Sequence, residues 1–491
     1  MKKSVLFLAL FLALNSCTTE ELQNENPKLE MAQTDPLTGK QINERINQSI
    51  KTNGTFNWKN ESDHFIWSAV FRGNKMLSIG FGSSKDDFDR SKSPDNKEME
   101  NEILSVIKKH EGLEPARFLL TSDKYLNQMD VIINNEETLT ALRQMKTIRY
   151  VEPADYHYFE NESQLSSRSS SSGSSGCGFS SATLSAVDYT STTPSAKIPW
   201  AFTKHNIPDA WSYSTGAGVT IGLIDTGVSS EQTLLGNNFN NGASSGRTIT
   251  KVGAYNSDGA ADQCGHGTKM ASVMAAPRNN SGFPVGVAYN ANLIAYRAAT
   301  NVVLETSSEQ NGVKTAFTEL GNNANVKIIS MSMGHIFSVG KIEDGVKYAY
   351  TRGKLIFCAG GTSTSFTNFV GVIFPASMSE TQAITGVKEN TSNQKCDVCH
   401  SGSQIDFTFQ MERASGSTVP VLSYYNNQSD YVGGSSVATA ATAGIAALVW
   451  AKNPSWTREQ VLNKMRQSAT YYPNVNSNYG YGNINVLKAV Q

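Results

Sequence analysis

Apolar and polar positions divide the chain into a small folded block and a larger one. In the small block, two regions have the spacing of amphipathic helices, and four short apolar runs are typical of strands. The expected helices are residues 99–110 and 136–145, and the expected strands are residues 64–71, 75–81, 129–134 and 148–153. This order predicts a small α+β domain with helices on one face of a sheet.

The larger block alternates short, mostly apolar strands with helical segments. Helices are expected after His266, at residues 341–352 and after Ser436, and strands at residues 219–224, 292–297, 326–332, 354–359 and 383–387. Strands without an exposed polar face are typical of sheets that are covered on both sides. The pattern predicts an α/β fold with a mainly parallel sheet flanked by helices.

Two polar stretches separate the folded blocks from the rest. Residues 18–60 are rich in Asn, Gln, Thr, Glu and Lys, which predicts a flexible tether. Residues 163–176 are almost entirely serine and glycine and predict a linker. The expected units are therefore residues 1–17, 18–60, 61–160, 161–190 and 191–491.

The first 17 residues have the pattern of an export signal. Lys2 and Lys3 precede an apolar run at residues 5–14, which is too short to span a bilayer. The following Leu-Asn-Ser-Cys resembles the lipobox of bacterial lipoproteins, which implies lipid attachment at Cys17. The expectation is an exported protein anchored by lipid to the cell envelope, at the outer membrane or cell surface. The alternative is an ordinary secretory signal with an incidental cysteine.

Composition excludes one class of partner. The chain has 491 residues and a formal net charge of -1. Without a basic field, nucleic acid is not an expected partner.

Three glycine-rich motifs carry the candidate chemistry. Asp225 ends an apolar strand in GLIDTG, His266 lies in CGHGT before a helix, and Ser436 lies in GGSSVATAATAG at the start of another helix. Singly, each residue is also explained as a turn, a helix cap or a packed side chain. Together, they provide a nucleophile, a base and a group that orients the base. This set predicts hydrolysis by a serine nucleophile.

The order of these motifs and their local sequences resemble the subtilisin-like serine peptidases, over roughly residues 195–491. Ser435 and Ala440 depart from the usual serine motif, which has threonine and proline at these places. The resemblance implies that Ser436 attacks a peptide carbonyl, His266 transfers the proton and Asp225 orients the imidazole. It also implies a protein or peptide substrate, and that Ser332, Met333 and Gly334 pair with it through their backbone.

One position departs from the family at the oxyanion site. After the strand ending at Ala359, the family usually has Ala-Gly-Asn, whereas this chain has Gly361 as the third residue. Loss of such a donor lowers turnover by about 10²–10³-fold. The backbone N–H of Ser436 remains, and Thr362 and Ser363 are nearby hydroxyls. This departure keeps a second hypothesis open, a subtilase-fold protein with weak or no turnover that binds peptides or a partner.

The small block resembles the inhibitor-type propeptide of the same family, mainly in its closing strand at residues 150–152 and its position. The resemblance implies a zymogen whose propeptide acts as an intramolecular inhibitor. It places processing between about Tyr158 and the serine-rich linker. Cleavage after Tyr158 or Phe159 is one hypothesis.

Five cysteines remain besides Cys17, so at least one has no partner within the chain. Cys358 lies in an apolar strand and is expected to be a buried thiol, and Cys396 and Cys399 are placed to pair locally. The string CDVCH at residues 396–400 also matches c-type haem attachment, a rival of another class that the rest of the chain disfavours. No cofactor is expected for the chemistry. Structural calcium is common in the family, but no local signature identifies its ligands here.

Overall fold

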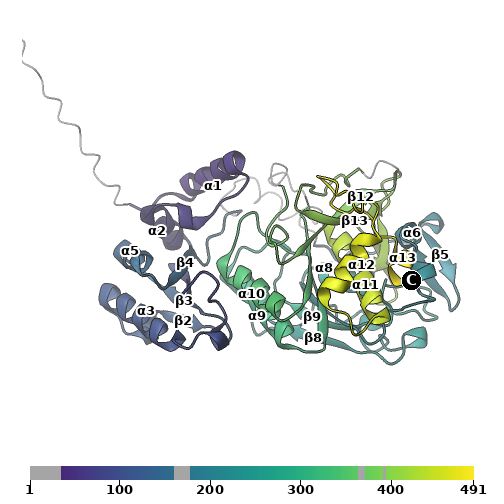
Figure 1. Ribbon diagram of the computed structural model, residues 1–491, viewed down its shortest axis with the longest axis horizontal. Coiled ribbons are helices and arrows are strands. Elements are labelled where there is room, and N and C mark those ends of the chain that lie inside the picture. Colours follow the sequence, from purple (N-terminus) through teal and green to yellow (C-terminus); the bar gives the residue numbers. More distant parts are fainter. Residues whose placement is uncertain (1–34, 160–176, 363–370, 391–393) are drawn as a thin grey trace, which may run out of the picture.

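The chain forms two units that lie side by side, a small N-terminal one and a large C-terminal one (Figure 1). The computed structural model describes residues 35–159, 177–362, 371–390 and 394–491. The expected signal residues, Cys17 and the serine-rich linker lie outside the described residues.

The small unit is a four-stranded antiparallel sheet covered by helices. The strand order is β2-β3-β1-β4. The strands are β1 (Met76–Phe81), β2 (Leu119–Ser122), β3 (Gln128–Ile132) and β4 (Ile148–Pro153). The helices are α1 (Gly39–Asn53), α2 (Asp63–Arg72), α3 (Asn96–Glu111), α4 (Pro115–Phe118) and α5 (Glu136–Gln144), with a 3₁₀ turn at Trp58–Asn60. The two predicted helices and three of the four predicted strands are present.

Two predictions for this unit were wrong. Residues 39–60 are not a flexible tether, because Thr38 and Gln41 form a capping box at the start of α1. Isoleucines spaced four residues apart on α1 then enter the core of the small unit: Ile42, Ile46 and Ile50.

Residues 64–71 are not a strand but lie within helix α2. The Ser62 hydroxyl accepts a hydrogen bond from the Phe65 N–H and caps this helix. The buried side chains include Phe65, Ile66, Ala69 and Val70, which lie on one helical face. An apolar run of this length is ambiguous between strand and helix, and here the cap decides it.

The large unit is built on a seven-stranded sheet in the order β13-β12-β11-β10-β7-β9-β8. Every neighbouring pair in this sheet is parallel. Its strands are β7 (Thr220–Asp225), β8 (Ile249–Gly253), β9 (Asn292–Arg297), β10 (Val326–Met331), β11 (Leu355–Ala359), β12 (Gln382–Lys388) and β13 (Ile405–Glu412). Two hairpins flank it: β5 (Tyr189–Thr192) with β6 (Ala196–Pro199), and β14 (Val419–Leu422) with β15 (Ser429–Val432).

Helices cover both faces of this sheet, which confirms the predicted fold class. Helices α8 and α11 pack in one apolar core, and α9 and α10 pack in a second core against other side chains of the same strands. The long helices are α8 (His266–Ala275), α9 (Ser307–Asn322), α10 (Gly340–Thr351), α11 (Gly434–Lys452) and α12 (Arg458–Gln467). The short ones are α6 (Trp200–Lys204), α7 (Ile207–Ala210) and α13 (Val486–Val490).

Helix α11 is the one described helix that is long and apolar enough to cross a membrane. It is almost wholly buried between the sheet and α8, so its apolar character is explained by the core.

The large unit begins earlier than the predicted residue 191. The Ala182 N–H donates to the Ser429 carbonyl (2.7 Å), and the Ser180 hydroxyl donates to Asp430 (2.6 Å). Residues 177–190 therefore belong to the large unit, which the polar composition of this stretch concealed.

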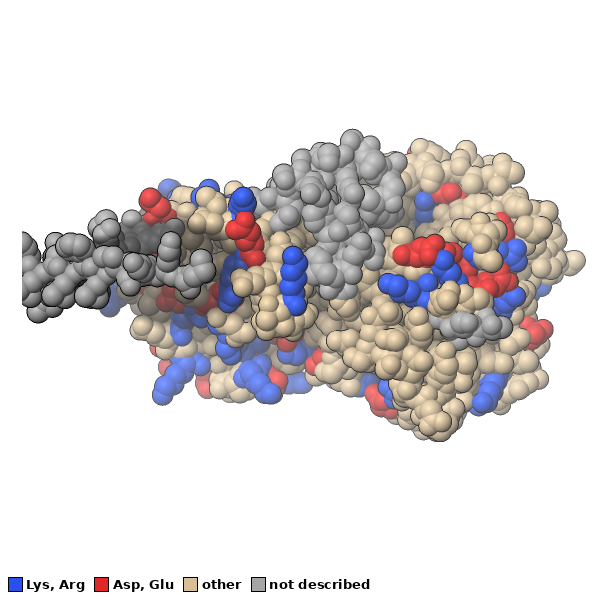
Figure 2. Space-filling model, turned by 90° about the horizontal axis from the view of Figure 1, so that it is seen from above, with Lys and Arg blue, Asp and Glu red and all other residues tan. Residues whose placement is uncertain are grey.

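Charged residues of both signs are interspersed over the face seen from above (Figure 2). This mixture agrees with the near-zero formal net charge of the chain.

Candidate active site

Asp225 and His266 form a buried, hydrogen-bonded pair at the carboxyl end of strand β7. The His266 Nδ1 and Asp225 Oδ1 atoms are 2.7 Å apart, and the two side chains are 4% and 0% exposed. The Thr226 N–H also donates to Asp225 Oδ1 (2.8 Å). When Nδ1 carries the proton and donates a hydrogen bond to Asp225, the other ring nitrogen, Nε2, can act as a base.

Glycines on both sides allow His266 to approach β7. Gly265 has a φ of +85°, which favours glycine, and Gly267 lies so close that a Cβ there would be 2.1 Å from the Gly227 carbonyl oxygen. The two glycines of the motif are thus required by the backbone geometry, one by conformation and one by contact.

A second buried carboxylate, Asp262, organises the loop before His266. It accepts hydrogen bonds from the Cys264 and Gly265 N–H groups (2.9 and 2.8 Å) and from the hydroxyls of Thr226 and Thr268 (2.8 and 2.6 Å). Burial raises the pKa of Asp262, and these hydrogen bonds oppose the increase. Sequence reasoning missed Asp262, although it lies only four residues before His266.

Ser436 is the third residue of α11 and is partly exposed, whereas the residues around it on the helix are buried. Helix α11 packs against α8, whose first residue is His266. The serine and the histidine therefore lie in the first turns of two neighbouring helices. The N-terminal turn of α11 directs backbone N–H groups and the positive end of the helix dipole toward a developing negative charge.

The strand predicted to bind substrate lies beside Ser436, but one of its three predicted residues is already paired within the protein. The Ser332 hydroxyl donates to the Ser436 carbonyl oxygen (3.3 Å). Gly334, however, already pairs with residues 302–304, because its N–H donates to the Val302 oxygen and its carbonyl accepts from the Leu304 N–H. The prediction of backbone pairing with a peptide therefore rests on Ser332 and Met333.

Gly361 follows strand β11 beside the start of α11. Its N–H donates to the Ser435 hydroxyl (3.2 Å), and its φ is +125°. A Cβ at this position would be 2.5 Å from the Nδ1 atom of His400. Gly361 therefore follows strand β11 at the position predicted from the sequence. The space that a side chain on this residue would enter is filled by the His400 ring.

The cysteines form two disulfides and leave one described thiol free. Cys396 pairs with Cys399, as expected, and Cys358 is a buried thiol whose pKa is raised by burial. The second disulfide, Cys177–Cys264, joins the start of the large unit to the loop two residues before His266. Sequence reasoning did not find this pair, because the two cysteines are 87 residues apart.

The proposed haem motif has no free thiols, since Cys396 and Cys399 are bonded to each other. Among the described residues, no three His, Cys, Asp or Glu side chains are grouped closely enough to hold a metal ion.

Comparison with known proteins decides the family. The model of the subtilase family, Peptidase_S8, matches residues 216–482, which is more than half of the chain. The chain belongs to the subtilase family. Its large unit has the fold of the subtilisin-like serine proteases.

Two curated relatives illustrate the likeness of this subtilase. Subtilisin E of Bacillus subtilis (strain 168) is 32% identical over 302 residues, covering 60% of this chain and 71% of the relative. M-protease of Shouchella clausii (strain KSM-K16) is 29% identical over 303 residues, covering 61% and 72%. Among solved structures, MycP1 from Mycobacterium smegmatis is similar with a TM-score of 0.48 and 19% identity, covering 65% of this chain and 91% of that one.

Proposed function

We propose that this subtilase is a serine endopeptidase that hydrolyses peptide bonds of proteins with Asp225, His266 and Ser436. The buried hydrogen bond between His266 and Asp225, beside the helix that carries Ser436, is the observation that supports this proposal. The His266 Nε2 atom takes the proton of the Ser436 hydroxyl as its oxygen attacks the carbonyl carbon. The imidazolium then gives that proton to the leaving amine. A water molecule then attacks the ester formed with Ser436 by the same two proton transfers and releases the second product.

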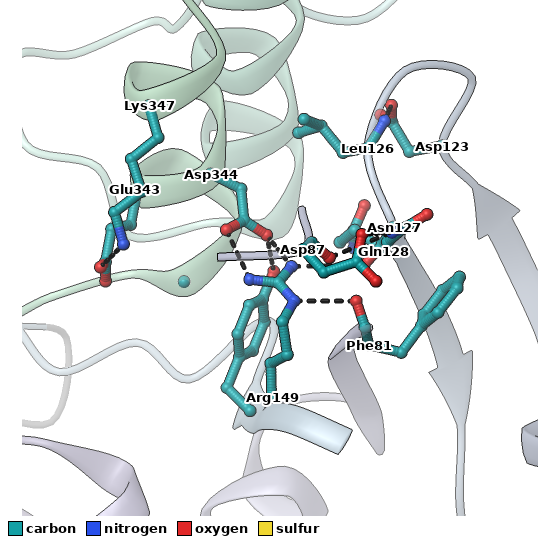
Figure 3. A network of polar contacts seen from close by, with 12 residues as sticks. Phe81, Asp87, Asp123, Leu126, Asn127, Gln128, Arg149, Glu343, Asp344 and Lys347 are labelled. Carbon is teal, nitrogen blue, oxygen red and sulfur yellow. Dashed lines mark hydrogen bonds and ion pairs between the residues drawn. The ribbon is translucent and has the colours of Figure 1, made fainter. Parts of the chain in front are cut away.

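We propose further that the small unit is an inhibitory propeptide and that the full chain is a zymogen. Polar contacts join its sheet to helices α9 and α10 of the large unit, and Figure 3 shows those around Asp344 of α10. Arg149 on β4 donates to the Phe81 carbonyl (2.8 Å) within its own unit and to both oxygens of Asp344 on α10. Lys341 on α10 pairs with Asp130 on β3 at 2.8 Å, and both side chains are buried.

Acidic residues of the small unit also cap two helices of the large unit. The Gly340 N–H at the start of α10 donates to Glu152 (2.7 Å), and the Ser307 N–H at the start of α9 donates to Asp155 (2.8 Å). Side-chain oxygens at helix N-termini accept hydrogen bonds from N–H groups that have no partner within the helix. These two hydrogen bonds attach the small unit to the first turns of helices α9 and α10.

The ends of the segment between the units lead to the same region. Phe159 donates its N–H to Glu305 (2.5 Å) and its ring contacts His335, three residues beyond Ser332. Cys177 is bonded to Cys264 beside His266. We place the processed bond between these two anchors, Phe159 and Cys177. Cleavage after Tyr158 is disfavoured, because that side chain is 1% exposed in the core of the small unit.

Export and lipid attachment at Cys17 remain proposals that rest on the sequence of the first 17 residues. A substrate in the cell envelope or outside it would follow from them. The test is metabolic labelling with a fatty acid, which should label the wild type and not Cys17→Ala.

The second candidate function is a subtilase-fold protein that binds peptides with little or no turnover. The absence of a side chain at Gly361 favours it, because the usual amide donor is missing.

A fluorophosphonate probe distinguishes these two functions. The processed protein should be labelled at Ser436 in about one-to-one ratio, and Ser436→Ala should not be labelled. Absence of labelling in correctly folded wild type would remove the enzyme proposal and leave the binding function.

A further inference from the structure

The turn after strand β11 crosses the start of α11, and Thr362 lies at the contact. Its hydroxyl oxygen is 3.2 Å from the Ser435 hydroxyl oxygen. It also lies against Gly434, where an added Cβ would be 2.9 Å from Thr362 Oγ1. Gly434 and Ser435 are the two residues before Ser436, so the Thr362 hydroxyl lies at the N-terminal turn that carries the nucleophile.

Gly361 cannot supply a side-chain donor at this turn. A Cβ there would enter the His400 ring, and His400 is held by one hydrogen bond of its backbone and one of its ring. The His400 N–H donates to the Gly361 carbonyl (3.0 Å), and His400 Nδ1 is 2.8 Å from the Gly371 carbonyl oxygen. The next residue, Thr362, is the one whose side chain contacts the serine helix, while Ser363 lies outside the described residues.

We infer that Thr362 is a catalytic residue, and that its hydroxyl and the Ser436 N–H together bind the oxyanion of the tetrahedral intermediate. This inference rests on the proposed endopeptidase function. It deepens that function by assigning the donor that Gly361 lacks.

The hydrogen bonds at the turn favour this role. Ser435 Oγ accepts from the Gly361 N–H at 3.2 Å, which leaves its own proton free to be donated to Thr362 Oγ1. Either hydroxyl can be the donor in this pair, and when Ser435 donates, the Thr362 hydroxyl can donate its hydrogen bond to the oxyanion. Each bond in such a chain polarises the next, so the terminal hydroxyl becomes a stronger donor. Threonine is also stiff at χ1, which lowers the entropy lost when its hydroxyl is held in place.

The chemical step balances without a further group. As Ser436 Oγ bonds to the carbonyl carbon, the π electrons of the carbonyl move to its oxygen and the serine proton moves to His266 Nε2. The oxygen becomes an anion that accepts hydrogen bonds from Thr362 and the Ser436 N–H, and neither donor loses its proton. When the carbonyl re-forms, the C–N bond breaks and the amine leaves with the proton from His266.

Thr362→Val tests this role, because valine keeps the shape and removes the hydroxyl. We expect kcat for a chromogenic peptide to fall by about 10²–10³-fold with little change in KM, as for loss of one oxyanion donor. Thr362→Ser should retain kcat within about tenfold, since the hydroxyl is kept. Processing of the full chain is a single turnover, and it should be slowed more by Thr362→Val than by Thr362→Ser.

Two measurements separate a catalytic role from a structural one. Thermal unfolding of Thr362→Val should stay near that of the wild type. Affinity for a peptide aldehyde, which forms a tetrahedral adduct, should fall by the same factor as kcat. Affinity for the corresponding peptide alcohol, which forms no adduct, should not change.

The outcome is decisive in either direction. If Thr362→Val is folded and its kcat lies within threefold of the wild type, the assignment is wrong. Failure of the endopeptidase proposal looks different, because the wild type itself would then show neither turnover nor fluorophosphonate labelling of Ser436. If Thr362→Val unfolds, a folded Thr362→Ser with wild-type kcat supports the assignment, and a folded Thr362→Ser with kcat more than 10²-fold below the wild type overturns it.

Discussion

Two buried acid–base pairs in this molecule have nearly the same geometry and different purposes. Asp225 and His266 lie 2.7 Å apart inside the large unit, and Asp130 and Lys341 lie 2.8 Å apart between the two units. All four side chains are at most 4% exposed. The first pair joins parts of one fold that stay together, whereas the second joins two units that we propose to separate.

The surroundings of the two pairs differ accordingly. The first lies above an apolar core made of sheet and helices, whereas the interface around the second holds further charges, including Arg149, Asp344 and Lys314. Burial raises the pKa of Asp130, but the charges of Lys341 and Lys314 outweigh this and hold it below its ordinary value. An interface of charged groups is readily solvated after the units part. Several buried charged groups thus meet at the surface that we propose to detach.

The largest expected effect comes from breaking the first pair. Asp225→Asn removes the anion that fixes the tautomer of His266 and stabilises its protonated form. We expect turnover to fall by about 10⁴-fold with a small effect on stability. The half-time of processing and the thermal midpoint together measure this. Turnover within tenfold of the wild type would show that the pair is structural.

Breaking the second pair should weaken docking and spare turnover. Asp130→Ala leaves Lys341 buried without its partner, which costs about 3–5 kcal/mol, or roughly 10²–10³-fold in affinity between the cleaved units. Gel filtration of the processed protein measures how much of the small unit stays bound.

Asp130→Leu with Lys341→Met is the matched control, because an apolar pair of similar size should recover most of the affinity. Tight docking in the Asp130→Ala variant would contradict the contrast between the two pairs.

The Cys177–Cys264 disulfide lies within the large unit, which we expect to stay folded after the two units part. Cys177→Ser should lower the free energy of unfolding of the processed enzyme by about 2–4 kcal/mol, because the disulfide closes a long loop. Its residue separation is 87, against 3 for Cys396–Cys399. Removal of the shorter disulfide by Cys396→Ser with Cys399→Ser is the control and should have the smaller effect on the denaturation midpoint.

The smallest effect expected is a dependence of docking on pH. Burial raises the pKa of Glu152 to about 8, aided by Glu343 and Asp344 and opposed by the Gly340 N–H and Lys341. The docked state therefore holds a proton that the free unit loses above about pH 4.5, so docking weakens as pH rises toward 8. We expect binding to be roughly 50-fold weaker at pH 8 than at pH 6.

Glu152→Gln should flatten this dependence. Asp155 does not confuse the result, because its pKa is lowered to about 2 and it stays charged in this range. Docking that tightens from pH 6 to 8 in the wild type would contradict the assigned role of Glu152.

The candidate catalytic residues could be proposed from the sequence because their motifs are local. Asp225, His266 and Ser436 each lie in a short string whose glycines meet a backbone requirement, such as the contact of Gly267 with Gly227. Apolar strands of the large unit were equally clear, since burial on both faces leaves an unbroken apolar run.

Features that depend on distant contacts were missed. Helix α1 is polar on most positions and is held by three isoleucines that meet the core of the small unit, so its composition resembled a tether. The Cys177–Cys264 disulfide and the hydrogen bonds from Thr226 to Asp262 join segments far apart in sequence. The sequence offered both Thr362 and Ser363 as nearby hydroxyls, and the contact of Thr362 with the serine helix became visible only in the structure, because the direction of a side chain after a strand depends on the turn.

Expression of the full chain beside its Ser436→Ala variant tests the central claim most directly. Intact mass and N-terminal sequencing should show two fragments in the wild type, with the new N-terminus between residues 160 and 177, and an uncut chain in Ser436→Ala. Identical processing of both proteins would contradict self-cleavage by Ser436 and assign the cut to another protease.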